Sequence, residues 1–141
     1  MDSKLQTLKT RLNEAHDLEM VGDLLEWDQL TYMPIGGGET RAEHTTTVKR
    51  LAHEKFTSDE IGQLLDDLSA NGAVGDYDSD DASLVRVVCW KYNRQRKLPT
   101  ALVAELARHQ SAAQEIWIKA RAENNFALFQ PALEKMFDLK R

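Results

Sequence analysis

Apolar side chains recur at the period of an α-helix along the first part of the chain. Within residues 3–32 they stand three or four positions apart, or at multiples of that spacing, with charged and amide side chains between them. This pattern predicts one helix that buries a single stripe. At a rise of about 1.5 Å per residue the helix would be roughly 40 Å long, and it would overhang a small globule unless something larger supports it. The predicted stripe is Leu5, Leu8, Leu12, Ala15, Val21, Leu24 and Leu25.

The same period continues through the rest of the chain, and no segment shows a convincing strand pattern. It is cleanest over residues 99–124, where small alanines allow close helix approach and Trp117 fills the wide end of the stripe. The prolines at 34, 99 and 131 are far apart, which leaves long stretches free to form helices. Five further helices are therefore predicted, over residues 39–56, 59–70, 81–96, 99–124 and 126–137.

Capping signals support several of these boundaries. Residues 57–60 have the S/T-x-x-E form of a capping box, which predicts the start of the third helix. The Asn-Gly pair at 71–72 is a typical helix end. Ser79 or Asp80 is expected to cap the fourth helix.

These elements predict an all-α protein with five to six helices in long antiparallel helical hairpins. A length of 141 residues suits one domain with a real core, so residues 1–141 are interpreted as a single helical domain. With 42% hydrophobic and 29% charged residues, the composition is that of a globular chain and argues against disorder.

A formal net charge of −5 restricts the expected partners. Nucleic acid and anionic membranes repel a net acidic surface without a separate basic patch, so neither is expected as a partner. No apolar run approaches the roughly 20 residues of a membrane span, and the charged N-terminus is unlike a signal peptide. The one cysteine, Cys89, cannot form an internal disulfide, which fits a cytoplasmic location.

Residues 25–41 form a corner around which the chain is organised. Pro34 lacks a backbone N–H, and the three glycines at 36–38 accept backbone angles that other residues avoid, so the first helix is expected to stop here. The glycines lack the following Lys-Ser/Thr of a phosphate-binding loop. A structural bend is therefore the preferred interpretation.

The residues expected to matter most are structural rather than catalytic. Trp27, Met33 and Trp117 are predicted to anchor the core, while Asp28 and Arg41 are predicted to pair across the corner. The predicted structural set is Trp27, Asp28, Met33, Pro34, Arg41, Pro99, Trp117, Phe126 and Phe129.

No metal site is expected in this chain. Its histidines are nowhere four positions apart, the spacing that places two ligands on one helix face. Residues 53–57 begin like the zinc-protease motif H-E-x-x-H, but a threonine stands in place of the second histidine. The acidic linker over residues 73–81 lacks the ligand spacing, central glycine and closing glutamate of an EF-hand, so it is interpreted as a loop. The histidines are His16, His44, His53 and His109.

The remaining chemistry-bearing residues also favour structural interpretations. Cys89 lies on an apolar stripe, whereas reactive thiolates need an accessible electropositive setting. Ser111 lacks the G-x-S-x-G context of a nucleophile. In each of the acidic pairs at 66–67 and 80–81, the two neighbouring side chains point to different faces of a helix, which suits exposed positions. The basic cluster over residues 91–97 could bind phosphates, but a solvated helix end favoured by the helix dipole is the preferred interpretation.

Three blocks of residues occur in an order that is typical of one family. They are Trp27, Asp28, Gln29, Met33, Pro34, Gly37 and Arg41; then Arg96, Lys97, Leu98, Pro99, Leu102 and Val103; then Ser111, Ala113, Trp117, Ala120, Arg121, Asn125, Phe126, Phe129, Pro131 and Leu133. Together they span nearly the whole chain and resemble the N-terminal region of the carboxypeptidase Taq family, the thermostable-type zinc metallocarboxypeptidases.

The resemblance implies part of a longer, mostly helical, cytoplasmic and commonly homodimeric hydrolase that releases C-terminal residues from peptides. Members hold zinc, or another divalent metal, through the histidines of H-E-x-x-H and a downstream glutamate, while the glutamate of the motif activates water. No position here matches those residues, so neither a cofactor nor a catalytic residue is assigned to this chain. The implied partners are the remaining catalytic part, a second copy and peptide substrates.

Two functions remain open. In the first, the chain forms one wall of the substrate groove of a metallocarboxypeptidase and is inactive alone. In the second, it is a stand-alone helical interaction or regulatory module, a truncated relative of the peptidase. The first predicts an apolar face that is meant for the missing part and is exposed in the isolated chain.

Overall fold

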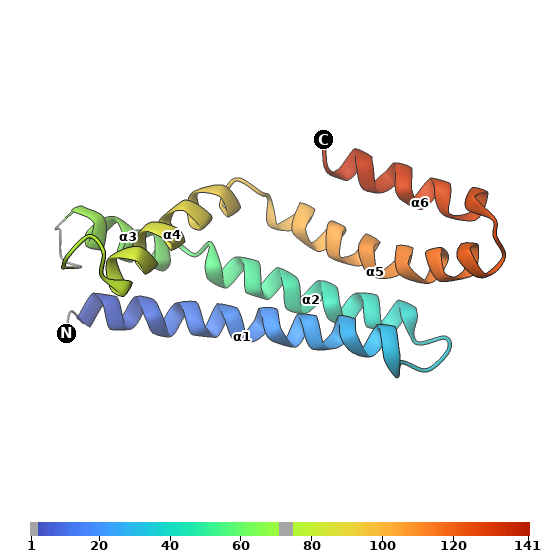
Figure 1. Ribbon diagram of the computed structural model, residues 1–141, viewed down its shortest axis with the longest axis horizontal. Helices are drawn as coiled ribbons and strands as arrows, with labels where there is room; N and C mark the ends of the chain where they lie inside the picture. Colours follow the sequence, from blue (N-terminus) through green and yellow to red (C-terminus); the bar gives the residue numbers. More distant parts are fainter. Residues whose placement is uncertain (1–2, 71–74) are drawn as a thin grey trace. The chain divides into compact units, whose positions relative to one another are not determined.

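The computed structural model describes residues 3–70 and 75–141, and within them the chain forms six helices and no strand (Figure 1). Each predicted helix is present, with ends within two residues of those expected, and the all-α class is confirmed. The predicted helix end at 71–72 lies outside the described residues. The helices are α1 (Ser3–Thr31), α2 (Gly38–Phe56), α3 (Asp59–Ala70), α4 (Asp80–Gln95), α5 (Thr100–Ala122) and α6 (Phe126–Leu139).

The start of α3 corrects the predicted capping box by one residue. The Ile61 amide donates to Ser58 Oγ at 3.5 Å, which makes Ser58 the cap. The Thr57 hydroxyl instead donates to the His53 carbonyl at 2.7 Å, because it lies at the end of α2. Both Ser and Thr occur as helix caps, and the S/T-x-x-E motif accepts either, so the motif alone did not identify Ser58.

The start of α4 follows its predicted signal, and α5 ends in a backbone conformation that suits asparagine. At the start of α4 the Ala82 amide donates to Ser79 Oγ at 3.2 Å. At the end of α5, Asn124 takes a positive φ of 49°, and the Asn125 amide donates to the Ala120 carbonyl at 2.8 Å. This left-handed closure stops a helix, and asparagine tolerates it better than most residues do.

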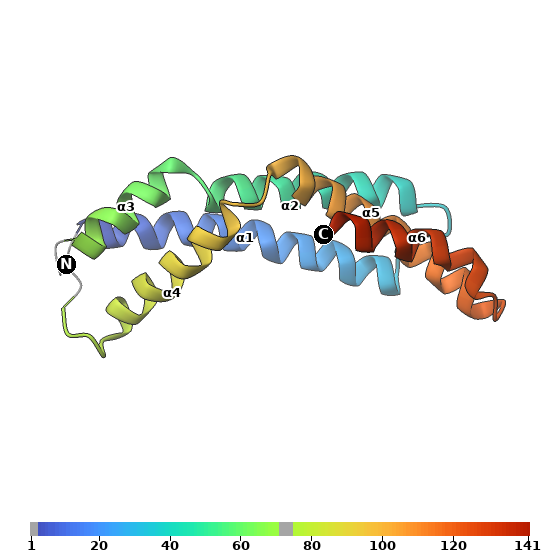
Figure 2. The same ribbon diagram turned by 90° about the horizontal axis from the view of Figure 1, so that it is seen from above.

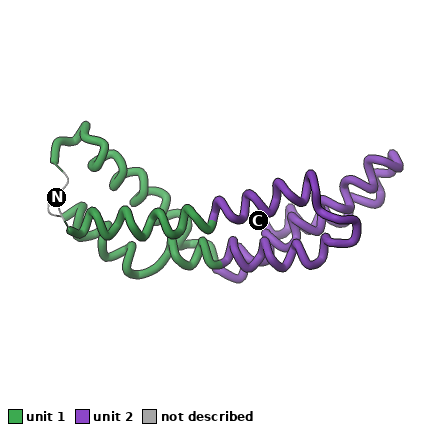
Figure 3. Tube along the Cα trace, turned by 90° about the horizontal axis from the view of Figure 1, so that it is seen from below, with its two compact units in different colours: residues 1–18, 51–99 green, residues 19–50, 100–141 purple. Residues whose placement is uncertain are grey.

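The chain forms two compact units, each made from two separate stretches of sequence (Figure 3). Unit 1 comprises residues 1–18 and 51–99, and unit 2 comprises residues 19–50 and 100–141. Helices α1 and α2 are each continuous across the division, so both contribute to both units. The interpretation of residues 1–141 as a single domain stays a prediction.

Unit 1 is built on large aliphatic side chains from α1, α3 and α4. Leu8 is fully buried, and Ile61, Leu65 and Leu68 retain only 1% of their accessible surface. The ring of Tyr92 closes this core, and its hydroxyl donates to the Ser58 carbonyl at 3.3 Å. The core residues are Leu5, Leu8, Ile61, Leu65, Leu68, Val85, Val88 and Tyr92.

Unit 2 buries small side chains instead. Antiparallel α5 and α6 lie side by side (Figure 2), and a further pair is formed by the parts of α1 and α2 that belong to this unit. The buried stripe predicted for residues 3–32 is wrong in this unit, because Val21 and Leu24 are exposed. The buried residues of unit 2 are Ala42, Thr45, Thr46, Ala107, Ser111, Ala113, Ala120 and Ala132.

Candidate functional site

The corner between α1 and α2 lies in unit 2 and combines a helix stop with a tight turn. The amides of Tyr32 and Met33 both donate to the Asp28 carbonyl, at 3.0 and 2.9 Å, and so end α1. The Gly37 amide then donates to the Pro34 carbonyl at 3.0 Å across a four-residue turn. Its third residue, Gly36, has a φ of 90°, as a type II turn requires. The predicted bend is confirmed.

Arg41 joins the two helices at this corner. Its Nη2 lies 2.6 Å from Asp28 Oδ2, which confirms the predicted pair, and its Nη1 donates to the Leu25 carbonyl at 2.7 Å. The Arg41 side chain is only 16% exposed. A guanidinium held by two acceptors fixes the direction in which α2 leaves the turn.

The tryptophans predicted as core anchors are not buried in this chain. Trp27 is 53% and Trp117 is 39% exposed. Asp28 is turned toward Arg41 of α2, whereas the preceding Trp27 is exposed, with its ring centre 5.7 Å from that of Tyr32 in an edge-to-face arrangement. The core-anchor prediction is therefore wrong for these two residues, while Met33 is half-buried.

The other predicted structural residues lie at helix starts. Pro99 immediately precedes α5. Phe126 is the first residue of α6 and is largely exposed, with its ring 6.5 Å from that of Phe129. Their importance for stability stays a prediction.

A reciprocal polar contact between α1 and α5 was not predicted. Gln29 Nε2 donates to the Ser111 carbonyl at 2.9 Å, and Ser111 Oγ donates to Gln29 Oε1 at 2.8 Å. Ser111 is 5% exposed, and its buried hydroxyl is occupied by the hydrogen bond to Gln29. The two residues are 82 positions apart and form no local motif. A short polar residue amid the alanines of the α5 stripe was the one signal that could have indicated this contact.

The histidines do not form a metal site. His53 is buried, and its Nε2 lies 3.1 Å from the Leu98 carbonyl. His109 Nε2 lies 2.7 Å from the Ala132 carbonyl, whereas His16 and His44 are exposed. Among residues 3–70 and 75–141, no three His, Cys, Asp or Glu side chains are grouped where they could hold a metal ion. The described residues therefore do not fit the zinc centre that the family resemblance implies.

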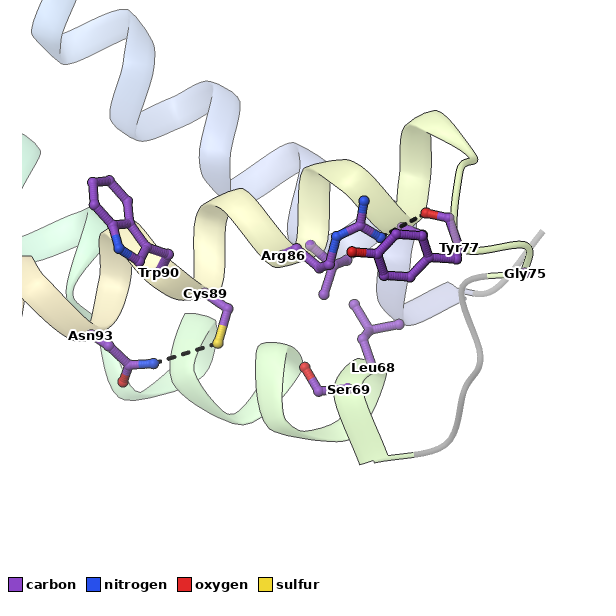
Figure 4. A pocket seen from close by; sticks show the side chains of 10 residues that line it. Leu68, Ser69, Gly75, Tyr77, Arg86, Cys89, Trp90 and Asn93 are labelled. Atoms are coloured by element: carbon purple, nitrogen blue, oxygen red, sulfur yellow. Dashed lines mark hydrogen bonds between the residues drawn. The ribbon is translucent and has the colours of Figure 1, made fainter.

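Unit 1 contains a pocket of about 580 Å³ between α3 and α4 (Figure 4). Leu68 and Val85 give it an apolar wall. The Arg86 guanidinium lies 3.9 Å from the centre of the Tyr77 ring and donates to the Tyr77 carbonyl at 2.7 Å. Arg86 thus holds Tyr77, which belongs to the acidic linker. The described part of this linker, residues 75–79, also contains a turn and Ser79, the cap of α4.

The cysteine that lines this pocket is also hydrogen-bonded. Half-buried Cys89 accepts a hydrogen bond from Asn93 Nδ2 at 3.4 Å and packs against the core of unit 1. Arg94, from the basic cluster, stacks 4.6 Å from the centre of the Trp90 ring at the rim. No general base lies beside the thiol in the described lining, so the pocket has no catalytic arrangement.

Surface ion pairs perturb two carboxyl groups, one in each unit. In unit 2, Arg108 donates two hydrogen bonds to Glu43, at 2.9 and 3.3 Å, and these lower the pKa of Glu43, with the guanidinium charge acting in the same direction. In unit 1, the hydrogen bond from Lys55 lowers the pKa of Glu14, which also pairs with Arg11. These groups are exposed, so the shifts describe helix pairing rather than catalysis.

The most unusual surface belongs to unit 2, which exposes many large apolar side chains. Met20, Leu24 and Trp27 lie at positions i, i+4 and i+7 on the outer side of α1, and we call them the α1 stripe. Among the described residues, no helix combines the length and apolarity needed to cross a membrane. Other exposed apolar residues of unit 2 are Val21, Leu30, Tyr32, Ile35, Ile116, Trp117, Ile118, Phe126, Leu128 and Phe137.

Comparison with known proteins assigns a family to these features. The model of the carboxypeptidase Taq (M32) metallopeptidase family matches residues 7–141. Thermostable carboxypeptidase 1 from Thermus thermophilus is 33% identical over 140 residues, which cover 99% of this chain and 28% of the relative.

Solved structures show the same fold. The crystal structure of BsuCP matches with a TM-score of 0.90 at 25% identity, over 97% of this chain and 27% of that chain. The M32 carboxypeptidase from Deinococcus radiodurans matches with a TM-score of 0.68 at 31% identity, over 98% of this chain and 27% of that chain. The chain thus spans little more than a quarter of the length of these relatives.

Proposed function

Since this chain belongs to the carboxypeptidase Taq (M32) metallopeptidase family, we propose that it supplies the N-terminal helical part of a metal-dependent carboxypeptidase. In this role its helices form one wall of the groove that admits peptide substrates. The chain contributes shape and support, while the residues that bind metal and activate water belong to the remaining part of the enzyme.

The observation that carries the proposal is the exposed apolar surface of unit 2. Soluble monomers seldom expose large contiguous apolar patches, and such patches commonly mark contacts with other protein. Leu24, Trp27 and Phe126 are each more than half exposed. Relatives of nearly four times the length offer the additional polypeptide that would cover them.

The chemistry of the described residues supports a non-catalytic role. The ring nitrogens of His53 and His109 lie against backbone carbonyls, and the Ser111 hydroxyl is bonded to Gln29. We therefore assign the metal to residues outside this chain. The complete enzyme would act on peptides as a cytoplasmic homodimer, a state that sedimentation of the complete protein would test.

The reading frame beyond Arg141 tests the proposal. We expect it to continue into an H-E-x-x-H motif, and we expect the product to release the C-terminal residue from an N-blocked dipeptide. A metal chelator should abolish this activity and zinc should restore it, while the chain that ends at Arg141 should show none. A stop codon directly after Arg141 would contradict the proposal and favour the stand-alone interaction module.

A further inference from the structure

We propose that the α1 stripe (Met20, Leu24 and Trp27) binds an amphipathic helix with basic edges, contributed by the remaining polypeptide of the peptidase. This inference rests on the proposed function for the source of that helix. The chemistry of the binding surface is argued from unit 2 alone.

The apolar part of the surface has the geometry of a helix-docking ridge. Met20, Leu24 and Trp27 are 46%, 60% and 53% exposed and follow each other along one side of α1. Anchors at i, i+4 and i+7 are the spacing by which one helix packs against another. Val21 and Leu30 are also exposed and widen the ridge beyond a single row.

The charged residues in the segment that carries the stripe are all acidic. Residues 19–40 contain five Asp or Glu residues and no Lys or Arg. Two of these carboxylates face α2, where Glu26 pairs with Lys49 and Asp28 pairs with Arg41.

Asp23 is different, because it is exposed and, in the described part of the chain, forms no ion pair. It follows Met20 by three positions and precedes Trp27 by four, which places it at the edge of the stripe. A covering helix therefore meets apolar side chains flanked by uncompensated negative charge. Lys or Arg at the edges of that helix would neutralise Asp23, whereas Asp or Glu there would be repelled.

The same charges argue against a second copy of this chain as the occupant. Two α1 stripes brought together would bring Asp23 of both copies into one interface without a basic partner, because a two-fold interface joins the same patch of both copies. Like charges at an interface disfavour that pairing.

The test uses two synthetic amphipathic helical peptides with identical leucine positions. One carries lysine and the other glutamate at every flanking position, and binding is followed by the anisotropy of a label on the peptide. We expect the lysine peptide to bind at least about tenfold more tightly, and added salt to weaken it. Equal binding of both peptides would overturn the charge argument.

Matched variants locate the binding. Asp23→Lys should weaken the lysine peptide roughly three- to tenfold, whereas Asp66→Lys, an exposed α3 position in unit 1 with the same change in net charge, should leave it unchanged. Leu24→Ser should abolish binding, whereas Val87→Ser, at an exposed apolar position of α4, should not. Circular dichroism of each variant confirms that it is folded.

Three further outcomes of these binding and sedimentation experiments would overturn the inference. The first is an equal loss with Asp66→Lys, which would indicate only general attraction to an acidic protein. The second is unchanged binding with Leu24→Ser. The third is a dimer in sedimentation that Leu24→Ser converts to a monomer, because a second copy would then cover the stripe.

The proposed function can fail separately, since a stop codon after Arg141 would remove the source of the helix without altering peptide binding. Conversely, a reading frame that continues into H-E-x-x-H but encodes no helix with an apolar row and basic edges would contradict this inference alone.

Discussion

Units 1 and 2 are stabilised in different ways although both are helical. Unit 1 buries leucine, isoleucine and valine around Tyr92, whereas unit 2 buries alanine, threonine and serine, and its large apolar side chains are half-buried or exposed. Burial of a large aliphatic side chain contributes about 1.5–3 kcal/mol, and an alanine contributes much less. Unit 2 therefore depends more heavily on close helix approach and on specific polar contacts, such as those of Arg41 and Ser111.

The difference shows how to interpret an exposed tryptophan. In a chain with one uniform core, an exposed Trp27 would be an isolated irregularity. Here it belongs to a unit in which the large apolar side chains are exposed or half-buried and the buried side chains are small. The small interior and the apolar exterior both support the proposal that unit 2 packs against further polypeptide of the peptidase.

The largest expected difference between the two units is in the stability lost when a leucine is truncated to alanine. Leu65→Ala in unit 1 should lower the free energy of unfolding by about 2–5 kcal/mol, because it leaves a cavity at a position that is 1% exposed. Leu24→Ala in unit 2 should cost less than about 0.5 kcal/mol, because that side chain is already in water. Urea unfolding followed by far-UV circular dichroism measures both, and equal losses would refute the contrast.

Glycine replacement gives the next largest effect and should differ in sign between the units. At Gly62 in unit 1, an added Cβ would lie 2.4 Å from the Tyr92 hydroxyl oxygen and 3.0 Å from ring carbon Cζ. That ring is buried, so Gly62→Ala should destabilise by about 1–3 kcal/mol. At Gly22 in unit 2, the nearest atom would be Lys49 Cε at 3.4 Å, so Gly22→Ala should stabilise by about 0.5–1 kcal/mol.

Thermal unfolding of the two glycine variants provides the measurement. Combining Gly62→Ala with Tyr92→Phe removes the closest oxygen and should recover part of the loss. If Tyr92→Phe recovers no stability and Gly22→Ala is also destabilising, the effect does not come from the contact with Tyr92.

The corner arginine should have a smaller effect on unit 2. Arg41→Ala removes hydrogen bonds to Asp28 and to the Leu25 carbonyl, and we expect a cost of about 1–2 kcal/mol. Arg41→Lys keeps the charge but not the fork-shaped donor, so its cost should be intermediate. A double-mutant cycle with Asp28→Ala isolates the pair. A coupling no larger than that of the exposed Arg108–Glu43 pair would show that the corner is not specially fixed.

The smallest expected effect is the pH dependence of stability, which can be followed through one carboxyl group in each unit, Glu43 and Glu14. Because Arg108 lowers the pKa of Glu43 in the folded state, the stabilisation from this pair is complete above the ordinary glutamate pKa and is lost as pH falls through the lowered value. Arg108→Gln should raise the pKa of Glu43 toward its ordinary range. In an NMR carboxyl titration, Glu14 in unit 1 should be unaffected, since its pKa is lowered chiefly by Lys55. A parallel shift of both groups would indicate a global change.

The helices could be predicted because their signals are local. The apolar period identified all six segments, and Ser79, Pro34 and Asn124 mark boundaries through their own backbone and side-chain chemistry. The Asp28–Arg41 pair could also be predicted, since only one short turn separates its helices. Choosing Ser58 over Thr57 as a cap required knowing where α2 ends.

What could not be predicted depends on contacts between distant parts of the sequence. Leu8 and Leu24 fit the same helical period, yet one is buried by α3 and α4 and the other is exposed. Periodicity identifies an apolar side of a helix but not the element that covers it. The Gln29–Ser111 contact was missed for the same reason, because it joins residues 82 positions apart.

The interleaving of the two units along the sequence sets an order of events during synthesis. Unit 1 has all its residues once position 99 has emerged, whereas unit 2 must wait for the segment from 100 to 141. Chains emerge at about 5–20 residues per second, so residues 19–50 remain without their α5 and α6 partners for several seconds. During that interval Gln29 also lacks Ser111, its hydrogen-bond partner on α5, whereas Leu24 and Trp27 are exposed both before and after α5 and α6 are made.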